Sequence, residues 1–258
     1  MTVEALPFVN WIFWTTLTSG SLLVVGGTEL AGGTTRGYRL FMAALLSVFA
    51  VILLLSELNL APDTLADTAG IRRSLVWILA GLTIGYLVAS IARWPRSGLG
   101  IAAGLSGIAA LASLAAAGGS LSAPIFAAQL MLSALALGAV NAAMLLGHWY
   151  LVTPKLSPVP LLRMMWLLVV ALVVEGLVTA LSFILVSSGP LSGPIGWLTW
   201  LRLVVGIALP VVTAVLAILA SRGASLQAST GLLYIGLAFV MAGSIAGASI
   251  TYLTGVPV

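Results

Sequence analysis

Eight long apolar stretches follow one another along the chain, and short segments rich in charged residues, proline and glycine separate them. The stretches cover approximately residues 8–28, 38–57, 73–93, 98–118, 124–148, 161–187, 196–220 and 227–253. A helix needs about 20 mostly apolar residues to cross the hydrocarbon core of a bilayer. The pattern therefore predicts an all-α, polytopic integral membrane protein with eight transmembrane helices, for which two tandem four-helix bundles are one possible arrangement.

The composition excludes soluble classes of protein. Apolar residues make up 61% of the chain and charged residues 6%, with a mean hydropathy of +1.22, whereas about a quarter of an ordinary soluble domain is charged. The short connections leave no room for a soluble domain, so residues 1–258 are predicted to form a single membrane domain in a lipid bilayer. The chain has no cysteine, which excludes disulfides and Cys-ligated metal, and we expect no metal site.

Arginine and lysine fall in alternate connections between the predicted spans. One set of connections carries most of them, namely Arg36, Arg39, Arg93, Arg96, Lys155, Arg163 and Arg222. The other side carries Arg72 and Arg73, which Asp63 and Asp67 offset. Basic residues at span ends indicate topology and not a nucleic-acid partner. Because connections rich in Lys and Arg stay on the cytoplasmic side, both termini are predicted to lie outside a bacterial-type inner membrane.

The two halves of the chain, 1–120 and 121–258, resemble one another faintly, which predicts an internal repeat. GSLLVVGGTEL in the first span can be laid on NAAMLLGHWYL in the fifth, and a basic connection follows each. With four spans in each half, the repeats would share one orientation about an axis along the membrane normal. Only the second half carries His148, Glu175, Arg202 and Pro210 within or next to its spans, so we expect a site there.

Glu175 lies about halfway through the sixth span, in WLLVVALVVEGLVTALSFIL. A carboxylate at this depth is costly, and such residues usually face a cavity or a partner. We interpret Glu175 as a proton-relay or ligand-binding group. The alternative is a protonated structural residue that donates to a serine or threonine of a neighbouring helix.

The end of the fifth span and the start of the sixth are predicted to form a quinone- or haem-binding site. A short connection, TPKLSPVP, makes these two helix ends neighbours, so that their polar and aromatic side chains could converge. The predicted residues are His148, Asn141, Tyr150, Arg163 and Trp166. A quinone could accept a hydrogen bond from the imidazole, and haem b would need a second ligand, either a methionine or a residue of another subunit. The alternative is an aromatic membrane rim.

Two polar residues lie nearer the outer ends of their predicted spans. Arg202, in GWLTWLRLVVG, is interpreted as extending outward to the lipid headgroups, and the alternative is pairing with an anionic ligand or a carboxylate. Gln129 lies at a similar depth in the fifth span. Pro210 predicts a kink and a free carbonyl in the seventh span.

Three functions are compatible with these features. The first is a membrane subunit of a larger respiratory or redox complex, which would anchor other protein subunits and would not be catalytic alone. The predicted layout resembles that of quinone-reactive anchor subunits of the polysulfide-reductase type, although the resemblance is of layout only and no motif carries it. The second is a proton-coupled transporter of a small solute or ion that uses Glu175. The third is a structural or assembly protein without a ligand.

The topology predicts that a reporter fused near Lys155 and a reporter fused at the C-terminus lie in different compartments. Alkaline phosphatase is active only outside the cytoplasm and green fluorescent protein is fluorescent inside it, so paired fusions measure both positions. We expect the Lys155 fusion to report the cytoplasm. The same compartment from both fusions would contradict the span count or the orientation.

Overall fold

All regular secondary structure in the described part of the protein is helical. The computed structural model describes residues 5–60, 68–116, 122–153, 156–185, 191–223 and 225–254. The helices are α1 (Ala5–Ala31), α2 (Arg36–Leu58), α3 (Ala69–Ala92), α4 (Ser97–Ala116), α5 (Ser122–Val152), α6 (Val159–Leu185), α7 (Gly196–Trp200), η3 (Leu201–Ala208), α8 (Leu209–Arg222) and α9 (Leu226–Thr254). Because α7, η3 and α8 continue one another as a single span, the described residues contain eight helices long and apolar enough to cross a membrane. This confirms the predicted fold of a multi-pass membrane protein.

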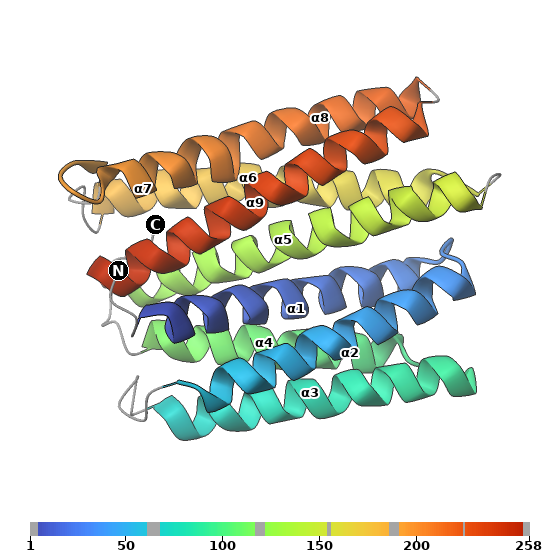
Figure 1. Cartoon of the computed structure of the whole chain (residues 1–258), viewed down its shortest axis with the longest axis horizontal. Coiled ribbons are helices and arrows are strands. Elements are labelled where there is room, and N and C mark those ends of the chain that lie inside the picture. Colours follow the sequence, from blue (N-terminus) through green and yellow to red (C-terminus); the bar gives the residue numbers. More distant parts are fainter. Residues whose placement is uncertain are drawn as a thin grey trace.

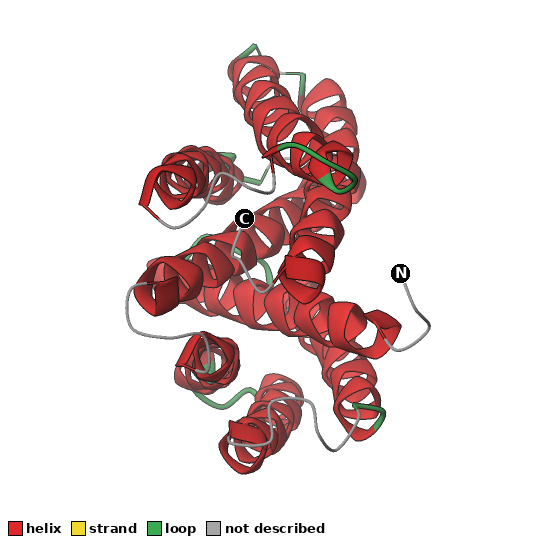
Figure 2. Cartoon of the chain, turned by 90° about the vertical axis from the view of Figure 1, so that its left-hand side faces the viewer, coloured by secondary structure: helices red, strands yellow, loops and turns green. Residues whose placement is uncertain are grey.

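The helices fall into a first half, α1–α4, and a second half, α5–α9, which meet along α1 and α5 (Figure 1). Figure 2 looks along the helices and shows the two groups on either side of this central pair. In each half every helix packs on the next, and the last helix returns to the first, as α4 does to α1 and α9 to α5. Across the halves, α4 also contacts α5 and α9 contacts α1. A duplication of four helices would produce the same order of contacts in both halves. The internal repeat itself stays a prediction.

The contact between α1 and α5 brings two helix backbones together. A β-carbon on Gly20 would lie 1.7 Å from the carbonyl oxygen of Ala134, and one on Gly138 would lie 2.0 Å from the carbonyl carbon of Gly20. Nearby, the Asn141 amide donates to the Ser21 hydroxyl at 3.0 Å. Small residues allow this close approach, which supplies the packing that holds helices together in lipid.

The glycine-rich helix α4 also packs tightly, on the other side of α1. A β-carbon on Gly104 would lie 2.6 Å from Cγ of Leu23, and one on Gly107 would lie 1.8 Å from the hydroxyl oxygen of Ser19. The composition of this stretch, GLGIAAGLSGIAALASLAA, therefore reflects a backbone-to-helix contact along α1. Ser97–Ala116 forms one continuous helix.

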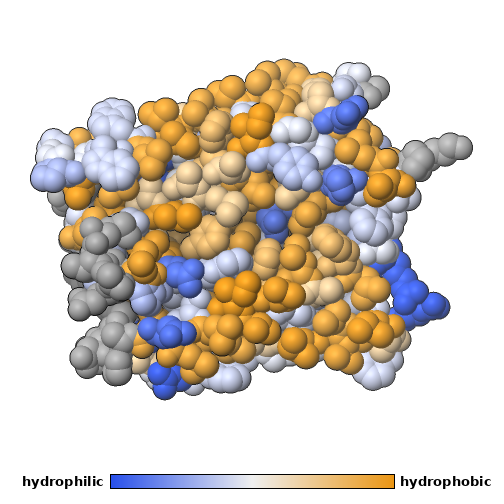
Figure 3. All heavy atoms as spheres, in the orientation of Figure 1, coloured by the Kyte–Doolittle hydropathy of each residue, from blue (hydrophilic) through white to orange (hydrophobic). Residues whose placement is uncertain are grey.

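One end of the bundle, here called the arginine-rich end, carries Arg36, Arg39, Arg93, Arg96, Arg163 and Arg222. There Glu29 pairs with Arg96 at 2.8 Å and with Arg39 at 3.5 Å. Figure 3 shows mostly hydrophobic residues on the face between this end, at the right, and the opposite end. Lys155, Asp63, Asp67 and both chain termini lie outside the described residues, and the orientation in the membrane stays a prediction.

Replacing Gly138 by alanine tests the contact between α1 and α5. The added methyl group meets backbone atoms of Gly20, which cannot rotate away, so we expect a loss of about 1–3 kcal/mol in the free energy of unfolding. Gly27→Ala is the matched control, because a β-carbon at Gly27 meets open space. Thermal unfolding in mild detergent measures both variants. Equal unfolding temperatures for the two variants would contradict the importance of this contact.

Candidate functional site

The second half contains a buried ion pair inside its helix bundle. Glu175 of α6 accepts a hydrogen bond at Oε1 from Nη2 of Arg202 in η3. The two side chains are 1% and 3% exposed. Arg202 therefore does not extend to the lipid headgroups, and that interpretation was wrong. Arg202 instead pairs with a carboxylate, which was the alternative interpretation, because a nearby carboxylate is a stronger hydrogen-bond acceptor than a distant headgroup.

The segment that carries Arg202 is a π-helix, and Pro210 explains its position. Proline has no backbone N–H to give to the carbonyl four residues earlier, and its ring clashes with that carbonyl. The preceding residues widen into the π-helical segment Leu201–Ala208, and the N–H of Leu209 donates to the carbonyl of Val204, five residues back. Such segments occur mostly as single wide turns and are frequent at functional sites.

Two glycines let this π-helix approach α9. A β-carbon on Gly206 would lie 2.5 Å from Cα of Gly243, and one on Gly243 would lie 2.2 Å from Cα of Gly206. The β-carbon on Gly243 would also lie 3.3 Å from Nη1 of Arg202. The guanidinium group therefore lies over a patch of bare backbone, which holds it between α6 and α9.

Neutral polar side chains surround the ion pair. Gln129 of α5 donates to the hydroxyl of Thr179 on α6 at 3.4 Å, and the hydroxyls of Ser133 and Ser244 are 3.4 Å apart. The Ser133 hydroxyl is also close enough to interact with the Glu175 carboxylate. Gln129, which the sequence placed at the depth of Arg202, thus belongs to the same region of the bundle.

A small cavity lies beside Arg202, with Glu175 outside its lining. Its volume is about 20 Å³, and its lining includes Thr16 of α1, Phe126, Gln129 and Ser133 of α5, Arg202 of η3 and Ser244 of α9. This is enough space for one water molecule or one ion of similar size. Nε and Nη1 of Arg202 and Oε1 of Gln129 are buried without a hydrogen-bond partner in the described structure. The site therefore combines a carboxylate, a guanidinium group and a polar space within the membrane.

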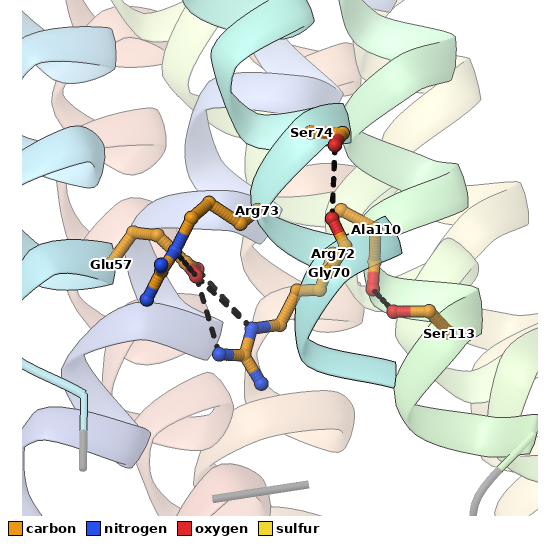
Figure 4. A network of polar contacts seen from close by, with 7 residues as sticks. All are labelled: Glu57, Gly70, Arg72, Arg73, Ser74, Ala110 and Ser113. Carbon is orange, nitrogen blue, oxygen red and sulfur yellow. Dashed lines mark hydrogen bonds and ion pairs between the residues drawn. The ribbon is translucent and has the colours of Figure 1, made fainter. Parts of the chain in front are cut away.

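The first half has an ion pair of the same kind near the end of its helices, which was not predicted from the sequence. Glu57 of α2 pairs with Arg72 of α3, with 3.2 Å between Oε1 and Nη2 (Figure 4). Nε of Arg73 lies 3.9 Å from the same carboxylate oxygen. The Arg72 guanidinium also lies 5.7 Å from the centre of the Trp11 ring. Glu57 is the next-to-last residue of α2, whereas α6 continues from Glu175 to Leu185. The signal in the sequence was a single acid at the end of one apolar stretch and an arginine opening the next.

The predicted quinone or haem site around His148 is not assembled. His148 is exposed, and its Nδ1 lies 3.4 Å from the hydroxyl of Tyr234 on α9. Asn141, two turns earlier on α5, is buried and donates to Ser21 of α1. The neighbour of α5 changes from α1 to α9 between these positions, so residues on one stripe of the helix meet different surroundings. The expectation that they converge was wrong.

The other residues of that predicted site also point elsewhere. The Tyr150 hydroxyl donates to the carbonyl of Ser157 at 2.7 Å, and Nη1 of Arg163 donates to the carbonyl of Ala31 at 3.4 Å. Trp166 is 46% exposed. Among the described residues no group of three or more His, Cys, Asp or Glu side chains could hold a metal ion. In the described structure these five side chains therefore do not line one common site, and a bound quinone or haem stays a prediction from the sequence.

Removing one partner of the Glu175–Arg202 pair should destabilise the protein more than removing both. Arg202→Met leaves a buried carboxylate without its counter-charge, for which we expect a cost of about 3–5 kcal/mol. Adding Glu175→Leu should restore most of that loss. Arg163→Met, at an exposed arginine, is the control and should change little. Thermal unfolding of the purified protein measures all three, and a double variant as unstable as Arg202→Met would contradict the pairing.

Comparison of the chain with protein-family models, with curated proteins and with solved structures finds no match in any of the three.

Proposed function

We propose that the protein is a proton-coupled transporter of a small solute, in which Glu175 carries the proton. The observation that supports this most is the cavity on the free side of Arg202, next to the buried ion pair. A pair that served only to lock two helices would need no polar space beside it. Glu175 itself lies outside the cavity lining, but paired ionisable residues in the interior of a membrane bundle are typical of ion pathways and proton relays.

The chemistry of the pair offers two states. With Glu175 ionised, the carboxylate and the Arg202 guanidinium neutralise one another. With Glu175 protonated, Arg202 keeps its charge, because arginine stays protonated in proteins, and it then needs another partner in a medium of low dielectric constant. A proton on Glu175 therefore changes what Arg202 binds, which is the coupling that a transporter requires.

The position of the pair suits this role better than that of Glu57 and Arg72. The Glu175–Arg202 pair lies between α6, η3 and α9, where the π-helical segment replaces ordinary α-helical hydrogen bonds. The Glu57–Arg72 pair joins the adjoining ends of α2 and α3.

We propose that both chain termini face the outside of the membrane, which would place the cavity in the outer half of the bundle.

A subunit of a redox complex stays the other function predicted from the sequence, and none of the described contacts favours it. Its test is separate from that of transport. Purification in mild detergent would show co-purifying redox subunits or a haem spectrum if the chain belonged to such a complex.

Proton uptake into liposomes tests the transport proposal. The full chain is reconstituted with an entrapped pH-sensitive dye in a potassium chloride buffer, and the outside is made more acidic than the lumen. Valinomycin with equal potassium on both sides holds the membrane potential at zero. We expect wild-type protein to acidify the lumen faster than protein-free liposomes do. Glu175→Gln keeps the size and hydrogen bonding of the side chain but removes its proton exchange, so it should lose all protein-dependent uptake.

Two further variants show whether the loss of proton uptake is specific to the carboxyl group of Glu175. Glu57→Gln is the matched control, because it removes a buried carboxylate paired with arginine outside the cavity region, and its uptake should stay near the wild-type rate. Glu175→Asp keeps the carboxyl group and should retain part of the uptake. Wild-type uptake by well-reconstituted Glu175→Gln would rule out the proposal.

A further inference from the structure

We propose that the cavity beside Arg202 binds a small monovalent anion of halide size, and that one anion enters together with one proton. This inference rests on the proposed function and names the solute. It is carried by the unpartnered nitrogen atoms of a buried guanidinium, by the size of the space they line and by the charge balance of the ion pair.

Two of the three buried atoms without a hydrogen-bond partner in the described cavity lining are donors, which favours an anion over a cation. Nε and Nη1 of Arg202 are donors without an acceptor in the described structure. Ser133 and Ser244 line the space with their hydroxyls 3.4 Å apart, and when one donates to the other, the second keeps a proton to give. Arginine N–H groups have no acceptor capacity, so a cation would meet a positive charge at close range.

Gln129 can complete this set of donors. Its amide oxygen is buried without a partner, while its amide nitrogen donates to Thr179 at 3.4 Å. A half-turn of the amide would place its N–H₂ group where the oxygen is and let the Thr179 hydroxyl donate to the oxygen. The anion would then be surrounded by donors from α5, η3 and α9.

The volume limits the size of the anion. A cavity of about 20 Å³ has room for one water molecule or one ion of similar size. Chloride and bromide are of this class, whereas sulfate and organic carboxylates are too large. No carboxylate lines the cavity, so the arginine sets its potential.

Charge balance couples the anion to a proton. With Glu175 ionised, the pair is neutral, and adding an anion would leave a net negative charge inside the membrane, which is expensive. With Glu175 protonated, the anion neutralises Arg202. In this step one O–H bond of a hydronium ion breaks, one O–H bond forms on the Glu175 carboxylate and a water molecule is released. The anion in the cavity then takes over the neutralisation of Arg202 from its Nε and Nη1 side.

Glu175 is the titratable group that can provide this coupling. The elements packed against α6 and η3 are α1, α5, α7, α8 and α9. Their other described charged or titratable side chains lie near the two ends of the bundle: Glu29, His148, Tyr150, Arg222 and Tyr234 at the arginine-rich end, with Arg163 of α6 itself, and Tyr252 at the opposite end. None of them lines the cavity.

Binding is measured on the full chain in detergent, as the rise in unfolding temperature on adding chloride to a gluconate buffer. A ligand that binds the folded state raises this temperature. We expect chloride and bromide to do so at low pH and sulfate at equal ionic strength to do nothing. The apparent affinity for chloride should fall about tenfold per pH unit over the range in which Glu175 loses its proton.

Three variants make the binding test specific. Glu175→Gln should still bind chloride but without pH dependence, because its Arg202 is always without a counter-charge. Glu175→Gln combined with Arg202→Gln is neutral, so it avoids an unpaired buried charge, and it should not bind. Arg72→Gln, which disturbs the other buried pair, should bind like the wild type. The absence of any chloride-dependent rise, or an equal rise in the double variant, would overturn the inference.

Transport in the liposomes separates this inference from the proposed function. If both are right, uptake of protons by the wild type stops when gluconate replaces chloride outside. Glu175-dependent uptake that continues unchanged in gluconate means that water fills the cavity, and the anion proposal fails alone. Chloride binding with the expected pH dependence but without Glu175-dependent uptake means that the site is correct and the transport proposal fails.

Discussion

The contact between the backbones of α1 and α5 is the constraint on which the rest of the arrangement depends. In lipid, apolar side chains gain little by moving from acyl chains to another helix, so association relies on close packing and hydrogen bonds. Gly20 and Gly138 provide this packing, and the Asn141–Ser21 hydrogen bond reinforces it. Since α1 and α5 each begin and close a cycle of helices, this contact lies at the centre of the interface between the halves, and the contacts of α4 with α5 and of α9 with α1 flank it.

The two halves place an acid and an arginine on corresponding helices but at different depths. Each has a glutamate on its second helix and an arginine on its third span, Glu57 with Arg72 and Glu175 with Arg202. In the first half the pair joins adjoining helix ends, and Trp11 covers it. In the second half α6 continues well beyond Glu175, so the pair lies deeper and any change in its charge must be compensated locally.

The deeper pair requires a helix that is not regular. Pro210 removes one backbone hydrogen bond, the preceding segment widens into a π-helix, and Gly206 and Gly243 allow this segment to contact α9 directly. The result is a guanidinium group held between Glu175 on one side and a polar cavity on the other. Pro210 and Gly206 in this span, together with Gly243 of α9, thus position the guanidinium group of Arg202.

The order of apolar and polar residues was enough to predict eight spans and their approximate ends. These properties follow from the length of each apolar stretch, which is local. The packing of the helices was needed to show that Arg202 meets Glu175, that His148 is exposed and that Asn141 faces α1. The physical reason is that lipid-facing and protein-facing sides of a membrane helix are both apolar. Hydropathy therefore tells which residues lie in the membrane but does not tell which helices they face.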